Sequence, residues 1–172
     1  MPDEKLDQIT GNINLRNVGN NFDISLELGQ QYQDFMVTFL LENEIAIPVY
    51  SSKAWQMNIG ESASGWEFKH DILLKTKHNL FVETMYKGEY SGIYKNDNTV
   101  YWVQGDYDKS YRFKKIELKD YCENNCRHIG PTQFRTCGYV LPEKEAHAIC
   151  LEYYELPGEP EWQKEWNKKN LR

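Results

Sequence analysis

The chain has 172 residues, of which 40% are hydrophobic and 27% charged, enough apolar matter for one packed domain. Its 20 Lys and Arg against 26 Asp and Glu give a net charge of -6, so the total charge does not indicate a general electrostatic preference for nucleic acid. No apolar run approaches the roughly 20 residues of a membrane-spanning helix, and the start MPDEKLDQIT is unlike a signal peptide. We therefore expect a soluble, cytoplasmic protein without membrane contacts, whose four cysteines are reduced.

The N-terminal third predicts an arm, a helix and one strand. Residues 1–22 are rich in Asn and Gly and poor in apolar groups, which indicates a flexible arm. Residues 29–44 carry apolar side chains at helical spacing and predict an amphipathic helix. Residues 45–50 are β-branched and contain Pro48, which favours a short edge strand.

The middle of the chain changes from helical to alternating periodicity. Turn residues separate short apolar runs, which predicts four strands, at 65–71, 79–86, 99–104 and 109–114. We expect the first two of these strands to be neighbours in one central mixed sheet, with helix 29–44 packed on it.

Helices and one more strand are expected in the last third. The pattern predicts a short helix after Lys115 and a strand at 136–141. A further helix should open at Pro142 and keep its apolar stripe as far as Tyr153.

Residues 157–172 predict a polar tail or a last helix, docked by Trp162 and Trp166. The order of the elements as a whole predicts a single α/β domain over residues 23–156, with a central mixed β-sheet flanked by helices.

The segment before Asp71 contains the strongest chemical signal. In a strand, Glu67 and Lys69 project from one face, because side chains alternate. The other face then receives Trp66, Phe68 and His70. If Glu61 lies on the turn before the strand, its carboxylate and that of Glu67 can share one Mg²⁺ or Mn²⁺ ion, since hard cations prefer oxygen ligands. Lys69 would orient or deprotonate a water and offset the negative charge of the transition state. The alternative is a weak surface ion pair on a solvated strand face.

Glu61 followed by Glu67-Phe68-Lys69 resembles the acid, spacer and Glu-x-Lys signature of the PD-(D/E)xK nuclease superfamily. Residues 65–71 and 79–83 are also similar to phage and bacterial proteins in which a Gly-x-Glu-x-Lys-x-Asp strand precedes an Asn-Leu-Phe-x-Glu strand.

This resemblance covers about residues 29–114 and implies a restriction-endonuclease-like fold. It further implies a divalent-metal-dependent endo- or exodeoxyribonuclease that hydrolyses phosphodiester bonds in DNA. In that interpretation Glu61 and Glu67 bind Mg²⁺ or Mn²⁺, and Lys69 is catalytic with them.

The sequence departs from the family pattern in two places. The first acid is Glu61 where the family usually has Asp, and the gap that follows it is short. The glutamate that many members carry on the first helix is replaced by Gln33 or Asp34. Among possible accessory residues, Glu83 is either a further acid near the site or an exposed strand residue. Asp71 either caps the strand end or joins the site.

Two weaker signals come from the second half of the chain. Cys122, Cys126, His128 and Cys137 are of the residue types that bind zinc. The paired Cys-x2-Cys spacing of common zinc sites is absent, however. The alternative is that these cysteines are partly buried thiols that pack as small apolar groups. Basic residues within 109–119 would hold DNA, helped by the tail residues Lys164, Lys168, Lys169 and Arg172.

Two other functions fit the sequence. A catalytically silent binding module with the nuclease fold is favoured by Gln33 and by the net charge. An acidic protein that mimics nucleic acid and inhibits a nucleic-acid enzyme fits the charge of -6 but leaves the Glu-x-Lys motif unexplained. The sequence leaves open whether the substrate is DNA or RNA and whether the chain forms a homodimer.

Overall fold

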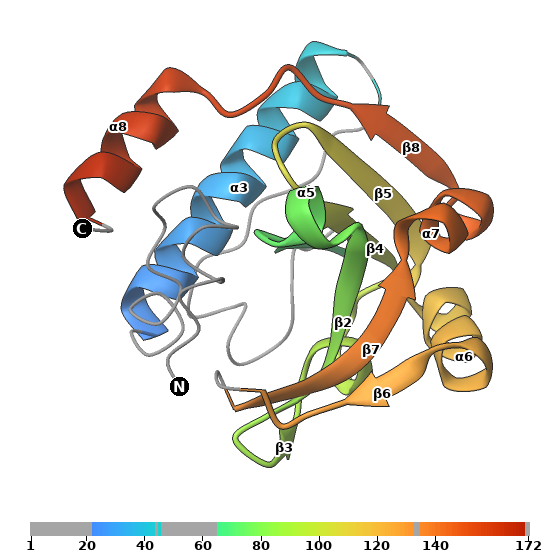
Figure 1. Ribbon diagram of the computed structural model, residues 1–172. Helices are drawn as coiled ribbons and strands as arrows, with labels where there is room; N and C mark the ends of the chain where they lie inside the picture. Colours follow the sequence, from blue (N-terminus) through green and yellow to red (C-terminus); the bar gives the residue numbers. More distant parts are fainter. Residues whose placement is uncertain (1–21, 44, 46–64, 133–134, 171–172) are drawn as a thin grey trace.

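The computed structural model describes residues 22–43, 45, 65–132 and 135–170, and these form a mixed α/β structure (Figure 1). They contain two four-stranded sheets, which we call sheet A and sheet B. The predicted arm and the strand expected at 45–50 lie outside the described residues, except for Phe22 and Ile45. Phe22 already belongs to the first described helix, which therefore begins before the predicted start at residue 29. None of the described helices is long and apolar enough to cross a membrane.

Sheet A has the order β1-β4-β5-β8 and is mixed, because β1 and β4 run parallel while the other pairs are antiparallel. Its strands are β1 (Trp66–His70), β4 (Tyr101–Gly105), β5 (Lys109–Lys114) and β8 (Glu152–Glu155). Sheet B is antiparallel, in the order β3-β2-β7-β6. Its strands are β2 (Asn79–Tyr86), β3 (Glu89–Tyr90), β6 (Arg127–Ile129) and β7 (Thr136–Pro142).

The helices connect and cover the two sheets. They are α3 (Phe22–Glu42), α5 (Leu74–Lys77), α6 (Lys115–Asn125), α7 (Glu143–Ile149) and α8 (Glu161–Asn170), with a 3₁₀ turn η1 (Gly92–Tyr94). Figure 1 shows α8 beside α3, and α6 and α7 close to the sheets at the opposite side of the molecule.

Helix α3 packs on one face of sheet A. Tyr32, Met36 and Leu40 are each 0% exposed, and their spacing of four residues places them on one side of the helix. They pack with Phe68 of β1 and Val103 of β4 in one buried cluster. The predicted packing of the first helix on the strand with the Glu-x-Lys motif is confirmed.

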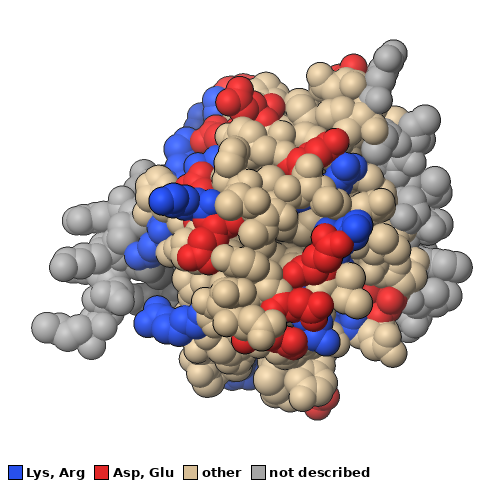
Figure 2. All heavy atoms as spheres, turned by 90° about the vertical axis from the view of Figure 1, so that its right-hand side faces the viewer, with Lys and Arg blue, Asp and Glu red and all other residues tan. Residues whose placement is uncertain are grey.

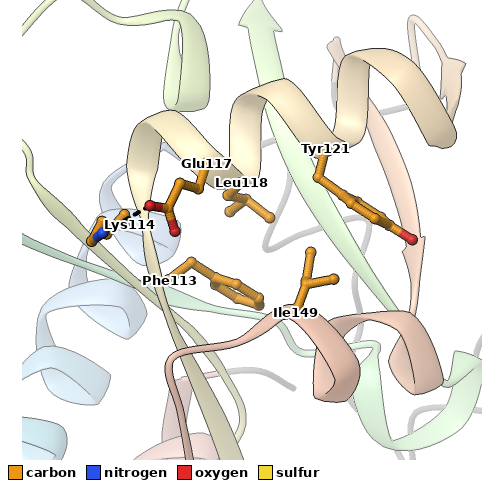
Figure 3. A pocket seen from close by; sticks show the side chains of 6 residues that line it. All are labelled: Phe113, Lys114, Glu117, Leu118, Tyr121 and Ile149. Atoms are coloured by element: carbon orange, nitrogen blue, oxygen red, sulfur yellow. Dashed lines mark hydrogen bonds and ion pairs between the residues drawn. The ribbon is translucent and has the colours of Figure 1, made fainter.

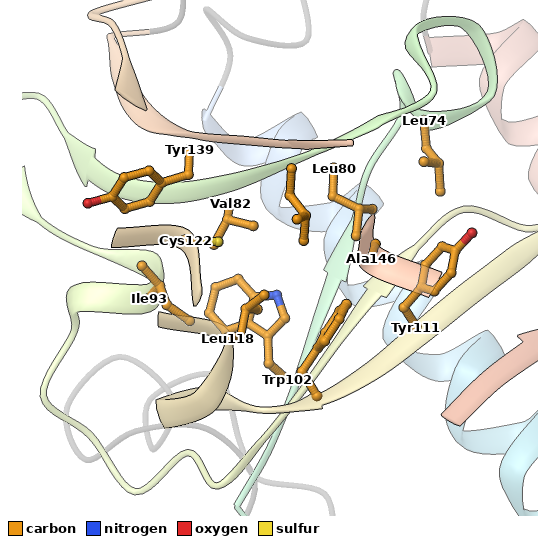
Figure 4. Close-up of a cluster of buried hydrophobic side chains, with 12 residues drawn as sticks. Leu74, Leu80, Val82, Ile93, Trp102, Tyr111, Leu118, Cys122, Tyr139 and Ala146 are labelled. Carbon is orange, nitrogen blue, oxygen red and sulfur yellow. The ribbon is translucent and has the colours of Figure 1, made fainter. Parts of the chain in front are cut away.

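The other face of sheet A packs against sheet B and forms the larger core (Figure 4). Trp102 belongs to this core while its neighbour Val103 belongs to the α3 side, as alternation along a strand requires. Leu80 and Val82 of β2 and Leu141 of β7 are all 0% exposed in this core. The chain therefore builds three layers, α3, sheet A and sheet B.

One prediction about the sheet is wrong. The segments 65–71 and 79–86 do form strands, but β1 pairs with β4, whereas β2 pairs with β3 and β7 in the other sheet. The short helix α5 between them carries the chain from one sheet to the other. The single central mixed sheet is thus replaced by one mixed and one antiparallel sheet.

The C-terminal part differs from the prediction in two details. The helix that opens after Pro142 ends at Ile149, and Tyr153 lies in β8 instead. In α8, Trp166 donates a hydrogen bond to Glu27 Oε1 (2.9 Å), but Trp162 remains 48% exposed. Only one of the two rings therefore docks the last helix.

Candidate active site

The Glu-x-Lys pair lies on β1 with both side chains on one face, as the alternation predicts. Lys69 Nζ is 2.5 Å from Glu67 Oε1, and the two side chains are 35% and 2% exposed. On the other face, His70 stacks on Tyr32 of α3 with ring centroids 4.9 Å apart. Glu67 is thus a carboxylate removed from water, while the ammonium beside it still reaches solvent.

The parallel neighbour β4 shapes the surroundings of this pair. Glu67 is in register with Trp102, and Lys69 Nζ lies 5.3 Å from the centroid of the Trp102 ring. The hydroxyl of Thr99, just before β4, donates a hydrogen bond of 3.4 Å to Glu67 Oε2. Because a buried charge without a partner is strongly destabilising, the contact with Lys69 offsets part of the cost of burying the Glu67 carboxylate.

Asp71 directly follows β1 and joins the two sheets. Its Oδ2 accepts hydrogen bonds from the Phe81 N–H of β2 (2.8 Å) and from Gln104 Nε2 of β4 (2.9 Å). Gln104 Nε2 also donates to the Phe81 carbonyl (3.0 Å), so the main chain at Phe81 bonds to side chains of sheet A. Burial raises the pKa of Asp71 to about 6, although these hydrogen bonds by themselves would lower it. The contacts favour the strand-end role over a place beside Glu67.

Glu83 lies on β2, at a register shift between Glu83 and Met85 in the pairing with β7. Its Oε1 accepts a hydrogen bond of 2.6 Å from the hydroxyl of Ser91, which directly precedes the 3₁₀ turn η1. The structure thus places Glu83 in sheet B, with a local hydrogen-bond partner in Ser91.

The first-helix candidates lie on the far side of sheet A. Gln33 and Asp34 belong to α3, which covers the face of β1 that bears Phe68 and His70. Glu67 and Lys69 project from the opposite face. The helix therefore does not bring Gln33 to the same face as the Glu-x-Lys pair.

Glu61, the second predicted metal ligand, lies outside the described residues. Within the described part of the chain, no group of three or more His, Cys, Asp and Glu side chains is arranged to hold a metal ion. Glu67 fits Mg²⁺ or Mn²⁺ by its chemistry, since a carboxylate oxygen is the ligand that these cations prefer. Its Oε2 atom accepts the long hydrogen bond from Thr99.

The basic residues within 109–119 that were predicted to hold DNA are neutralised by neighbouring acids. Of the predicted tail residues, Lys164 pairs with Glu161, and Arg172 lies outside the described residues. The pairs within 109–119 are Lys109–Glu143, Arg112–Glu152, Lys114–Glu117, Lys115–Asp97 and Lys119–Glu123. Figure 2 shows acidic and basic side chains interspersed on the face it presents, without a continuous patch of either sign. Any DNA contact there has to displace ion pairs, and the same face does not resemble an acidic mimic.

The cysteines do not assemble into a zinc site. All four are free thiols, and Cys122 is 0% exposed in the main core. Burial raises the pKa of the Cys122 thiol, which disfavours the thiolate that zinc requires. His128 Nε2 is hydrogen-bonded to the Thr84 hydroxyl at 2.8 Å. The alternative of small buried thiols describes Cys122 well.

A pocket of about 220 Å³ lies away from the Glu-x-Lys pair, beneath α6 (Figure 3). It is lined by Phe113, Lys114, Glu117, Leu118, Tyr121 and Ile149. The ion pair of Lys114 with Glu117 lies at one end and the Tyr121 ring at the other. Apart from that ion pair its lining is largely apolar, and it offers no grouping of acids for a metal ion.

Comparison with protein-family models, with curated proteins and with solved structures found no match for this chain. The function therefore has to be argued from the residues and their geometry.

Thr99 is the residue that the sequence did not single out. Its contact with Glu67 spans 32 residues of chain and depends on the parallel pairing of β1 with β4. Local patterns carry no information on such a pairing, so only the fold reveals it.

Proposed function

We propose that this protein is a divalent-metal-dependent nuclease with a restriction-endonuclease-like core that hydrolyses phosphodiester bonds in DNA. The observation that carries the proposal is the Glu67–Lys69 pair on one face of β1, with Nζ and Oε1 2.5 Å apart. A solvated strand face would leave both groups exposed, yet Glu67 is only 2% exposed. Burying the acid of an ion pair costs desolvation free energy that the attraction to its partner often does not repay, so this arrangement favours a functional role for the pair.

In this proposal Glu67 is a ligand of Mg²⁺ or Mn²⁺, and Glu61 is the second ligand that the resemblance supplies. When bound, the cation lowers the pKa of a water and polarises the phosphate. The Lys69 side chain is partly exposed, so in this proposal its positive charge is accessible to a phosphate group that approaches from the solvent. Its ammonium neutralises Glu67 before the cation binds and can then stabilise the charge that develops on the phosphate.

The decisive experiment measures cleavage by the full chain on supercoiled DNA, single-stranded DNA and RNA. We expect activity with Mg²⁺ or Mn²⁺ and none with Ca²⁺, because Ca²⁺ takes the same oxygen ligands in a looser geometry. Lys69→Ala should abolish turnover and leave Mn²⁺ binding nearly intact, since an ammonium is not a ligand. Glu67→Ala should lose both, and Lys69→Met keeps the apolar stem over Trp102 if the alanine variant is unstable.

Matched controls come from the exposed surface. Glu117→Gln and Lys144→Ala alter the same residue types at exposed positions of α6 and α7 and should cleave as the unmodified protein does. Cleavage that persists in Glu67→Ala after a chelator control would show that the activity lies elsewhere.

The silent binding module has one structural observation in its favour. The helix with Gln33 covers the opposite face of sheet A, so it supplies no ligand on the face of Glu67. Absence of cleavage on every substrate, together with retained binding of DNA, would favour this module over the nuclease.

A further inference from the structure

A second buried ion pair lies on the chain segment that leads into β4. Lys115 Nζ is 2.9 Å from Asp97 Oδ1, and the two side chains are 11% and 1% exposed. Lys115 also donates a hydrogen bond to the Lys95 carbonyl (2.7 Å). The nuclease mechanism uses neither residue, and buried ion pairs seldom add stability over apolar side chains. The pair therefore calls for another explanation.

Both residues of this ion pair are hydrogen-bonded to the main chain at Thr99 or at the residue that follows it. The Thr99 N–H donates to Asp97 Oδ1 at 3.0 Å. Lys115, at the start of α6, donates its own N–H to the Val100 carbonyl at 2.9 Å. Burial acts to raise the pKa of Asp97, but the hydrogen bonds from Lys115 and Thr99 lower it overall, so Asp97 stays an ionised acceptor at neutral pH.

Thr99 in turn contacts Glu67, the candidate metal ligand. Thr99 Oγ1 donates to Glu67 Oε2 at 3.4 Å, while Lys69 Nζ contacts the other oxygen, Oε1, at 2.5 Å. The last torsion of a glutamate side chain is broad, so the plane of its carboxylate is set by outside contacts. Lys69 and Thr99 together set that plane, one contact at each oxygen.

We propose that Thr99 is a positioning residue of the metal site, which orients the Glu67 carboxylate for the cation, and that the Asp97–Lys115 pair holds Thr99 in place. This inference rests on the proposed function and deepens it. Thr99 acts through Glu67 and does not touch the scissile phosphate in this scheme.

The test compares Thr99→Val, which removes the hydroxyl at nearly constant shape, with Thr99→Ser, which keeps it. Two quantities are measured: the dissociation constant of Mn²⁺, from the spin-resonance signal of the free ion, and the Mg²⁺ concentration that gives half-maximal cleavage. We expect both to rise about three- to tenfold in Thr99→Val, as for the loss of one ordinary hydrogen bond, because the contact with Glu67 is long. The rate at saturating Mg²⁺ should stay unchanged, and Thr99→Ser should restore both values.

Thr76→Val is the matched control, because Thr76 is exposed and its hydroxyl donates only to the nearby Leu73 carbonyl at 3.2 Å. It should leave Mn²⁺ binding unchanged. Thr99→Ala replaces Thr99→Val if the methyl group in place of the hydroxyl prevents folding, as judged by thermal unfolding.

Each outcome distinguishes this inference from the proposed function. If Thr99→Val binds Mn²⁺ as tightly as the unmodified chain while Glu67→Gln does not bind it, the inference is wrong and the nuclease proposal stands. If Thr99→Ser is as weak as Thr99→Val, the hydroxyl is not responsible and the inference is also wrong. If the unmodified chain neither binds Mn²⁺ nor cleaves DNA, both proposals are wrong.

Discussion

Replacement of Asp71 by Asn tests whether the carboxyl group that joins the two sheets titrates with a raised pKa in the folded protein. The Asp71 carboxylate is 7% exposed and accepts hydrogen bonds from the Phe81 N–H and from Gln104. One amide oxygen of Asn can take the place of the oxygen that accepts both bonds. The substitution therefore removes the charge and its titration while the bridge between the sheets is kept.

The magnitude follows from the pKa of Asp71. Burial raises it to about 6 in the folded protein, against a value of 3.8 in the absence of the fold. The folded state thus binds the proton more tightly, so this group adds stability as the pH falls through about 6. Between about pH 7.5 and about pH 5 the gain is about 1.4 kcal/mol, and Asn cannot provide it.

The assay is urea unfolding of both proteins at about pH 7.5 and about pH 5, followed by tryptophan fluorescence. The free energy of unfolding of the unmodified chain, minus that of Asp71→Asn, should rise by about 1.4 kcal/mol on acidification. Other titrating groups are shared and cancel in this difference. A difference that is the same at both pH values would refute the assignment of a buried, ionised carboxylate to Asp71.

Asp71→Ala and Asp120→Asn serve as the comparison variants. Alanine leaves the Phe81 N–H and the Gln104 amide without their acceptor, and an unpaired buried donor costs about 1–3 kcal/mol. Asp71→Ala should therefore be destabilised at both pH values. Asp120 is exposed on α6, so Asp120→Asn should show no such pH-dependent difference.

Three further predictions concern titration and backbone packing. Burial lowers the pKa of His70 to about 4 from 6.5, so protonation of this group alone is expected to lower the free energy of unfolding by about 2 kcal/mol between about pH 7.5 and about pH 5. His70→Phe keeps the ring stacked on Tyr32 and should remove that loss in the same urea assay. Gly92 has φ +52°, and a Cβ there would lie 2.2 Å from the Glu83 carbonyl oxygen, so Gly92→Ala should cost more than about 2 kcal/mol in thermal unfolding. Gly29 in α3 has open space around it, so Gly29→Ala should instead stabilise by about 0.5–1 kcal/mol. An unchanged melting temperature in Gly92→Ala would contradict the close approach.

The sequence by itself determined the features that depend on local periodicity. Alternation along 66–70 was sufficient to place Glu67 and Lys69 on one face, and the structure confirms it with their ion pair. The strands at 79–86 and 109–114 begin and end where their turn residues predict. These features rest on which neighbours along the chain share a face, and that follows from the geometry of a strand or a helix.

Only the tertiary structure decided which strands pair and what lies beside the candidate site. The strand with the Glu-x-Lys pair joins β4 rather than β2. Which strands pair depends on contacts between segments that are distant in the sequence, and these contacts are set by the whole core rather than by any local run of residues. Thr99 therefore comes to lie against Glu67 only because β1 and β4 are parallel neighbours. The same pairing places Gln104 where, with Asp71, it can bond the main chain of β2.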